Sequence, residues 1–109
     1  MSFKKISQQK ELEQLFKDNE RFFLLKNSTT CPISHEAYKE TENFAEENTD
    51  VPVYYLNVQE ARPLSNYIAE KFQIKHESPQ AILFENEKVT WHDSHWRVTK
   101  DSLKSSYKK

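Results

Sequence analysis

Apolar and polar residues follow two different periods along the chain, and each change of period marks a new element. Apolar side chains spaced three or four residues apart, with charged residues between them, indicate helices that turn one face to a core. These helices are expected at residues 7–19, 32–48, 60–74 and 99–107. Short apolar runs bounded by polar residues indicate strands. The strands are expected at residues 21–26, 51–58, 79–84 and 88–92.

The order of these elements, α-βαβ-α-ββ-α, restricts how the strands can pair. A strand, a helix and a second strand form a right-handed parallel crossover. The last two strands are separated only by Glu85, Asn86 and Glu87, so they form an antiparallel hairpin in which Asn86 is best suited to a positive φ. We therefore expect one α/β domain over residues 1–109, with a central four-stranded mixed sheet, helices on both faces and an extra N-terminal helix.

Polar residues at the helix ends support these boundaries. Ser7 and Thr99 stand where the first and last helices begin, and their hydroxyl groups can accept hydrogen bonds from the first helical turn. Pro32 and the pair Arg62-Pro63 suit the first turns of the second and third helices, where a missing N–H costs nothing.

Composition and charge narrow the possible partners. Sixteen Lys and Arg residues nearly balance seventeen Asp and Glu residues, so no broad cationic field favours nucleic acid or an anionic membrane. No run approaches the ~20 apolar residues of a membrane span, and the first residues lack the apolar run of a signal peptide. Glycine is absent, which excludes glycine-rich phosphate loops. We expect a cytoplasmic monomer that binds neither nucleic acid nor membrane.

The single cysteine, Cys31, lies between the strand expected at residues 21–26 and the helix expected at residues 32–48. One cysteine cannot form an internal disulfide, so any disulfide chemistry must involve a partner. Backbone N–H groups of the first helical turn, such as those of Ile33 and Ser34, together with the helix dipole, can lower the pKa of the thiol. Lys26 is a more distant positive charge. The alternative is a small, buried and inert side chain, which the polar neighbours of Cys31 disfavour.

Other side chains leave alternatives open. Trp91 and Trp96 could wall a binding groove, although aromatic residues near a sheet edge more often pack in the core. His92 and His95 could join the thiol as zinc ligands, but the chain has no Cys-x-x-Cys or His-x-x-x-His unit, so we expect no metal site. His35 is either a solvated side chain or a proton donor to the thiol.

Three features together resemble a known family. They are the run Thr30-Cys31-Pro32-Ile33-Ser34 after an apolar strand, the pair Ser78-Pro79 before a later strand, and the stretch from Trp91 to Thr99. This combination resembles the thioredoxin superfamily, and specifically the monothiol bacilliredoxins, the YtxJ-like bacillithiol system proteins. The resemblance implies a thioredoxin-like fold across nearly the whole chain.

The resemblance also implies roles for these residues. Cys31 would be the nucleophile, within an active-site motif that includes Thr30, Pro32, Ile33 and Ser34. Pro79 would be cis, and Ser78 would offer its backbone to the bound thiol. These two residues would form the thiol-binding loop.

A monothiol mechanism follows from Ser34, because a dithiol protein carries its resolving cysteine at this place and a hydroxyl group cannot resolve a mixed disulfide. By resemblance, Cys31 would remove bacillithiol from S-bacillithiolated client proteins and hold it in a mixed disulfide until an external thiol releases it. Bacillithiol would be a co-substrate, with no tightly bound cofactor. The alternative is a non-catalytic thioredoxin-like binding module in which Cys31 is a passive target of thiolation. An arsenate reductase is disfavoured because no arginine adjoins Cys31 in sequence.

Overall fold

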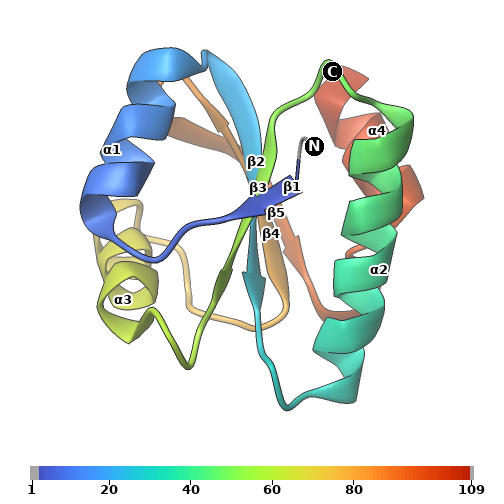
Figure 1. The fold of residues 1–109 in the computed structure, drawn as a ribbon, viewed down its shortest axis with the longest axis horizontal. Helices are drawn as coiled ribbons and strands as arrows, with labels where there is room; N and C mark the ends of the chain where they lie inside the picture. The colour runs from blue at the N-terminus through green and yellow to red at the C-terminus, as the bar shows by residue number, and fades with distance from the viewer. Residues whose placement is uncertain (1–2, 109) are drawn as a thin grey trace.

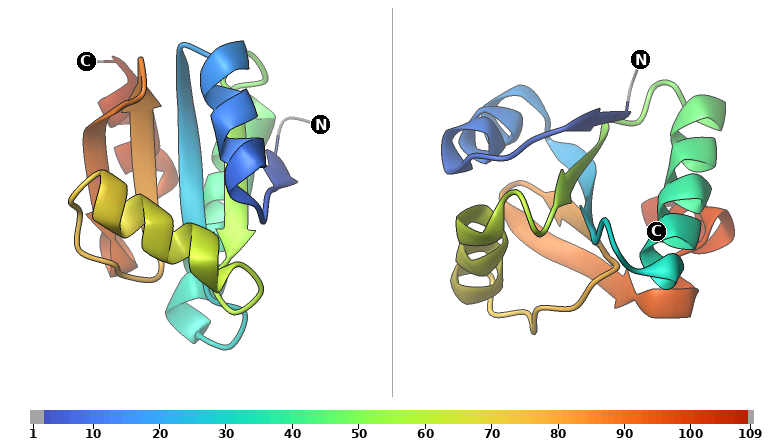
Figure 2. Two further views of the ribbon diagram at one scale, coloured as in Figure 1. Left: turned by 90° about the vertical axis from the view of Figure 1, so that its left-hand side faces the viewer. Right: turned by 60° about the horizontal axis from the view of Figure 1, so that its bottom comes forward.

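A five-stranded sheet forms the centre of the protein, with helices on both of its faces (Figure 1). The structure is a computed structural model that describes residues 3–108. The elements follow in the order β1 (Phe3–Lys5), α1 (Gln9–Asp18), β2 (Arg21–Asn27), α2 (Pro32–Glu47), β3 (Val53–Asn57), α3 (Arg62–Lys71), β4 (Gln80–Glu85), β5 (Lys88–Ser94), the short 3₁₀ helix η1 (His95–Arg97) and α4 (Lys100–Lys108). Helices α1 and α3 cover one face of the sheet, and α2 and α4 cover the other (Figure 2).

The strand order is β1-β3-β2-β4-β5, which confirms the predicted mixed sheet. Strands β1 and β2 run parallel to β3, whereas β4 is antiparallel to β2 and β5 is antiparallel to β4. The sheet has five strands rather than the four predicted, because β1 adds an edge. This strand has only three residues, Phe3–Lys5, two of them exposed lysines, so no local apolar pattern marks it. Its position depends on pairing with β3, where Phe3 lies beside Val53.

Strand β2 is buried on both faces, as its continuous apolar run predicts. Phe22 and Leu24 face the cluster beneath α1 and α3, whereas Phe23 and Leu25 face the cluster beneath α2 and α4. Because β2 lies at the centre of the sheet, its carboxyl end holds the loop that follows it in a fixed place.

One of the two predicted serine and threonine caps is wrong. The N-cap of α1 is Gln8 rather than Ser7, and the Glu11 carboxylate accepts the backbone N–H groups of both residues at 2.9 and 3.0 Å. The prediction for α4 is confirmed, since the Thr99 hydroxyl oxygen accepts the backbone N–H of Ser102 at 3.0 Å.

The remaining elements differ from prediction mainly at their ends. Helix α3 begins at Arg62, with Pro63 in its first turn, but ends at Lys71. Strand β3 is shorter than the predicted range, and β5 extends to Ser94. In the hairpin, Asn86 has the predicted positive φ of 52°, and Glu87 has one of 63°.

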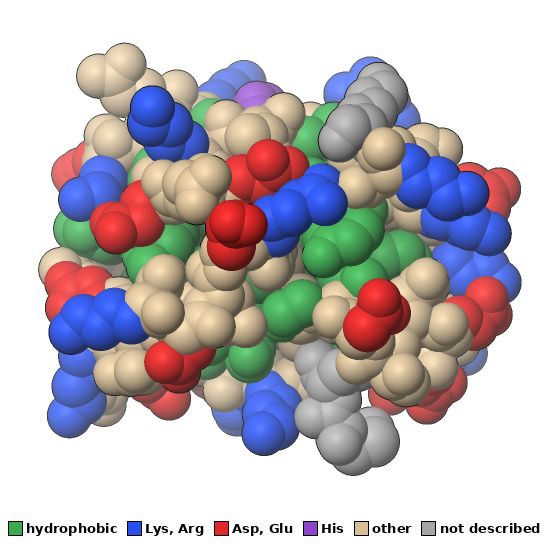
Figure 3. Space-filling view, turned by 90° about the horizontal axis from the view of Figure 1, so that it is seen from above, with side chains coloured by type: hydrophobic (Ala, Val, Ile, Leu, Met, Phe, Trp, Pro, Cys, Tyr) green, Lys and Arg blue, Asp and Glu red, His purple; other side chains and the backbone are tan. Residues whose placement is uncertain are grey.

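The described part of the chain contains no helix that is both long enough and apolar enough to cross a membrane. At the end of the molecule opposite to the start of α2, acidic and basic side chains are interspersed over the surface (Figure 3). This mixture agrees with the nearly balanced charge of the sequence.

Candidate active site

Cys31 is the N-cap residue of α2, at the carboxyl end of the central strand β2. Its backbone is extended, with φ of −104° and ψ of 124°, and its carbonyl oxygen accepts the backbone N–H of His35 at 3.1 Å. Pro32 occupies the first helical position, as predicted. The thiol therefore lies at the positive end of a 16-residue helix.

The first turn of α2 lowers the pKa of the Cys31 thiol. The largest cause is the backbone N–H of Ser34, and the N–H of Ile33 and the Ser34 hydroxyl act in the same direction, while partial burial of the thiol opposes them. These donors stabilise the thiolate, which is the nucleophilic form of cysteine. Cys31 is partly exposed, so a partner can reach it. Lys26 is not among the groups that lower this pKa, contrary to the suggestion from sequence.

Ser34 is fully buried directly below the thiol, at the first turn of α2. Among the described residues its hydroxyl oxygen has no hydrogen-bond partner with good geometry, although it lies near enough to contribute weakly to the lowered Cys31 pKa. A hydroxyl group in this place supports the thiolate but cannot form a disulfide with it.

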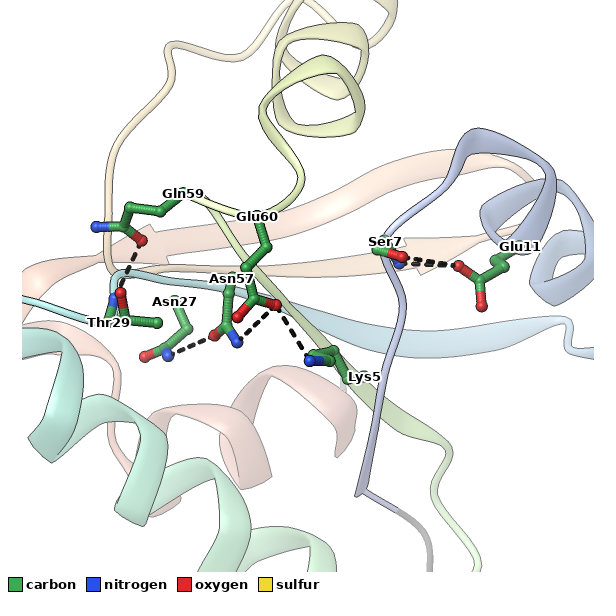
Figure 4. Close-up of polar contacts among 8 residues, drawn as sticks. All are labelled: Lys5, Ser7, Glu11, Asn27, Thr29, Asn57, Gln59 and Glu60. Atoms are coloured by element: carbon green, nitrogen blue, oxygen red, sulfur yellow. Dashed lines mark hydrogen bonds and ion pairs between the residues drawn. The ribbon is translucent and has the colours of Figure 1, made fainter.

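The loop between β2 and α2 is held by Gln59, which follows β3. The Gln59 amide nitrogen donates to the hydroxyl oxygens of Ser28 at 2.8 Å and Thr30 at 3.3 Å. Its amide oxygen accepts the N–H of Thr29 at 3.1 Å (Figure 4). Thr30 thus supports the loop rather than hydrogen bonding to the thiol. Sequence reasoning missed Gln59. The available signal was its position just after a strand parallel to β2, because such strands end at the same edge of a sheet.

The Ser78–Pro79 peptide bond is cis, which confirms the predicted geometry. Pro79 is buried just before β4, and its carbonyl oxygen accepts the backbone N–H of His95 at 2.9 Å. This bond joins the proline loop to η1. No hydrogen bond links Ser78 to Cys31 in the described part of the chain.

Two hollows flank the start of α2. One has a volume of about 340 Å³ and is lined by Asn27, Ser28, Thr29, Cys31, His35, Tyr38, Tyr55 and Asn57. The other has a volume of about 440 Å³ and is lined by Pro32, Ile33, Glu36, Ala37, Glu40, His95, Trp96, Val98 and Thr99. The thiol opens directly into the first hollow.

The structure places the two tryptophans in different environments, one packed against the core and one exposed, and leaves His92 and His95 at the surface. Trp91 packs edge-on against Phe23, with ring centroids 6.1 Å apart, so it is a partly buried side chain that packs against the core cluster. Trp96 is 67% exposed and lines the larger hollow. His92 and His95 are exposed, and within residues 3–108 no three His, Cys, Asp or Glu side chains gather in a way that could hold a metal ion.

A buried lysine near the site was not anticipated. Lys26 is fully buried beneath α3, and its ammonium group donates to the Ser65 carbonyl oxygen at 3.0 Å and lies 3.3 Å from Nδ1 of His76. The Ser65 hydroxyl also lies 3.2 Å from Nδ1 of His76. Burial lowers the pKa of Lys26 to about 8. His76 precedes Pro79 by three residues, so this network ties β2 to the loop that carries the cis bond.

Comparisons with known proteins agree with this geometry. A solved structure described as a candidate oxidoreductase with a thioredoxin fold is 42% identical, with a TM-score of 0.92 over 97% of this chain and 94% of that chain. A mutant thioredoxin from Halobacterium salinarum is 21% identical, with a TM-score of 0.78 over 95% of this chain and 86% of that chain. Mitochondrial thioredoxin 3 from Saccharomyces cerevisiae is 17% identical, with a TM-score of 0.77 over 98% of this chain and 94% of that chain. These last two likenesses concern the fold.

The sequence profile of monothiol bacilliredoxin BrxC matches residues 4–103, almost the whole chain. With the thioredoxin-like fold and a thiol at a helix N-terminus, this match gives the protein a thiol oxidoreductase function. The chain belongs to the monothiol bacilliredoxin BrxC family.

Proposed function

We propose that the protein removes bacillithiol from S-bacillithiolated proteins through Cys31. The Cys31 thiolate attacks the bacillithiol sulfur of the client disulfide. A new disulfide forms between Cys31 and bacillithiol, the client disulfide breaks, and the client sulfur leaves as a thiolate. An external thiolate then attacks the bound bacillithiol sulfur and frees Cys31. Each step exchanges one disulfide for another, so no further oxidant or reductant is needed.

The observation that carries this proposal is the placement of the only thiol of the chain at the N-cap of α2. There the N–H groups of Ser34 and Ile33 stabilise the thiolate. Such a thiolate is both a better populated nucleophile near neutral pH and a better leaving group when the mixed disulfide is resolved.

The proline loop supports the same proposal. We assign Ser78 and Pro79 to the binding of the partner sulfur, with a backbone group of Ser78 facing the incoming disulfide. The hydrogen bond from His95 to the Pro79 carbonyl oxygen fixes this loop against η1. A client chain would then run across Pro79 toward the exposed Trp96.

A de-thiolation assay tests the proposal. A model client carrying one bacillithiol disulfide is incubated with the reduced protein, and both are followed by intact mass. We expect bacillithiol to move from the client to Cys31 in equal amounts. Release of bacillithiol by Cys31→Ala, or the absence of an adduct on wild-type Cys31, would contradict the proposal.

Ser34→Cys tests the monothiol mechanism more directly, because a thiol is only slightly larger than the hydroxyl group it replaces. It places a resolving thiol within the first turn of α2. This thiol should attack the Cys31 sulfur of the adduct, so that an internal disulfide forms, bacillithiol leaves as a thiolate and the adduct does not accumulate. Ser34→Ala is the matched control and should still accumulate the adduct.

A further inference from the structure

The larger of the two hollows beside the start of α2, of about 440 Å³, leads away from the active site, and we call it the Trp96 groove. It begins at the two residues that directly follow Cys31 and lies between α2 and η1, which pack against each other (Figure 2). His95 lines this groove, and its backbone N–H donates to the Pro79 carbonyl oxygen, so the groove also adjoins the proline loop. A client chain bound at Cys31 and Pro79 would therefore continue into the Trp96 groove.

The indole ring of Trp96 is open to a partner. Its side chain is 67% exposed, and among the described residues no other large hydrophobic side chain is listed at the surface in this way. The face of an indole ring attracts an ammonium or guanidinium group. The groove is also lined by Ile33 and Val98, whose apolar surface suits the aliphatic stem of a lysine or arginine side chain.

The charged side chains that line the Trp96 groove include two carboxylates and no lysine or arginine. Glu36 is exposed on α2, and Glu40 lies one helical turn further along. The Glu40 Oε1 accepts the backbone N–H of Lys100 at 2.8 Å, a contact that does not neutralise its charge. Within residues 3–108 neither carboxylate forms an ion pair.

The cationic side chains that flank the groove in sequence are paired elsewhere. Arg97 forms an ion pair with Asp93 at 2.6 Å, and Lys100 forms one with Glu47 at 2.9 Å. Even with a protonated His95, the lining would keep an excess of negative charge. A cation supplied by a client would therefore find both unpaired carboxylates and an aromatic face.

The spacing along α2 shows where on a client this cation would stand. Glu36 and Glu40 lie five and nine residues after Cys31, which at 1.5 Å per residue places them about 8 and 14 Å further along the helix. An extended client chain covers that distance in about two to four residues. The cation would thus lie close to the thiolated cysteine in the client sequence.

We propose that the Trp96 groove selects protein clients that carry a lysine or arginine within a few residues of the thiolated cysteine. The cationic group pairs with the Glu36 carboxylate and lies over the ring of Trp96, while the client sulfur faces Cys31. The inference rests on the proposed function and names the class of client that the site prefers.

Synthetic peptides that carry one bacillithiol disulfide test the proposal through the rate of bacillithiol transfer to Cys31. Two peptides have the same composition and charge, one with its lysines beside the cysteine and one with them at its ends. A third has glutamates beside the cysteine. We expect the near-lysine peptide to react about fivefold faster than the end-lysine peptide, as one exposed ion pair and one cation–π contact would give. The glutamate peptide should be the slowest, and high salt should reduce the differences.

Glu36→Gln separates the groove from any direct effect of a nearby lysine on the client disulfide. It should lower the ratio of the near-lysine rate to the end-lysine rate about threefold, because the ion pair is lost. Glu46→Gln is the matched control, at an exposed position near the other end of α2, and should keep the ratio. Equal rates for the two lysine peptides, or a ratio that Glu36→Gln leaves unchanged, would overturn the inference.

Indole NMR signals locate the peptide without any thiol transfer. Reduced peptides are added to Cys31→Ser, and the near-lysine peptide should shift the Trp96 indole N–H signal more than the glutamate peptide does. The Trp91 signal should stay in place, because its ring packs against Phe23. An unshifted Trp96 signal would overturn the inference. A Trp96 signal that moves with protein concentration in the absence of peptide would place a second copy of the chain in the groove, and would overturn it too.

The outcomes separate this inference from the proposed function. If every peptide transfers bacillithiol to Cys31 at the same rate, the groove does not select a cation and the inference fails, while the proposed function stands. If no peptide transfers bacillithiol to Cys31, the proposed function fails and the inference fails with it.

Discussion

Replacing Lys26 with methionine should change how the stability of the protein depends on pH. The Lys26 ammonium is fully buried in the folded protein, and among the described residues it has no carboxylate partner. Its contacts are the Ser65 carbonyl oxygen and the His76 ring, which together do not replace the hydration of a charge. Methionine keeps most of the side-chain volume and removes the charge.

The size of the effect follows from the pKa of Lys26, which burial lowers from 10.5 to about 8. At 1.36 kcal/mol per pKa unit, this difference corresponds to a destabilisation of about 3 kcal/mol when the lysine is charged. Below pH 8 Lys26 is protonated in both the folded and the unfolded state, and the buried charge destabilises the folded state by the full amount. Between about pH 8 and 10.5 the unfolded state binds more protons, so stability rises with pH. Above pH 10.5 Lys26 is neutral in both states, so this destabilisation is no longer present.

Urea unfolding of the wild type and of Lys26→Met between pH 7 and 10.5 measures this effect. The free energy of unfolding of the wild type relative to the variant should increase by about 3 kcal/mol over this range. Tyrosine ionisation affects both proteins alike. His76, whose pKa is lowered by burial and by the Lys26 charge, titrates below the range. Lys17→Met, at an exposed position on α1, should show no such trend. A constant difference for Lys26→Met would refute the reasoning.

Three further predictions concern the site and its support. The rate of Cys31 alkylation by iodoacetamide should reach half its maximum at a pH below the value of about 8.5 of free cysteine, and activity should rise with pH up to that point and then level off. A midpoint at or above 8.5 would instead indicate a passive target of thiolation. Thr99→Ala should lower the free energy of unfolding by about 1 kcal/mol in urea melts, with a smaller loss for Thr99→Ser. Trp96→Ala should lower kcat/KM for a thiolated client more than for hydroxyethyl disulfide, because Trp96 is exposed and not part of the core. Equal losses with both substrates would argue against client contact at Trp96.

The parts of the fold that were predictable from sequence are those set by local interactions. The apolar run of β2 predicts a strand buried on both faces, and Cys31-Pro32 predicts a helix start, because each depends on neighbouring residues alone. The Thr99 cap and the positive φ of Asn86 are local in the same sense. The position of Cys31 at a helix N-terminus could therefore be predicted from the sequence alone.

The parts that were not predictable depend on residues far apart in the chain. Strand β1 exists only through pairing with β3, about fifty residues later. Gln59 supports the active-site loop across about thirty residues of sequence. Lys26 is buried, although lysine is almost always exposed, and only contacts with Ser65 and His76 explain its place. No local pattern distinguishes these residues from ordinary surface side chains.

The buried hydroxyl group of Ser34 determines the direction from which a resolving thiol can reach Cys31. Its place is fully buried below Cys31, so a resolving thiol there would attack from the inside of the protein, without competing with a client for space. With a hydroxyl group in this place, that internal route is closed, and the resolving thiol must approach Cys31 from solvent. On the solvent side the thiol opens into a polar hollow, while an exposed tryptophan lies beyond Pro32 and Ile33. The choice of resolving thiol must therefore depend on the residues that surround the exposed side of Cys31 rather than on the core that the fold shares with thioredoxins.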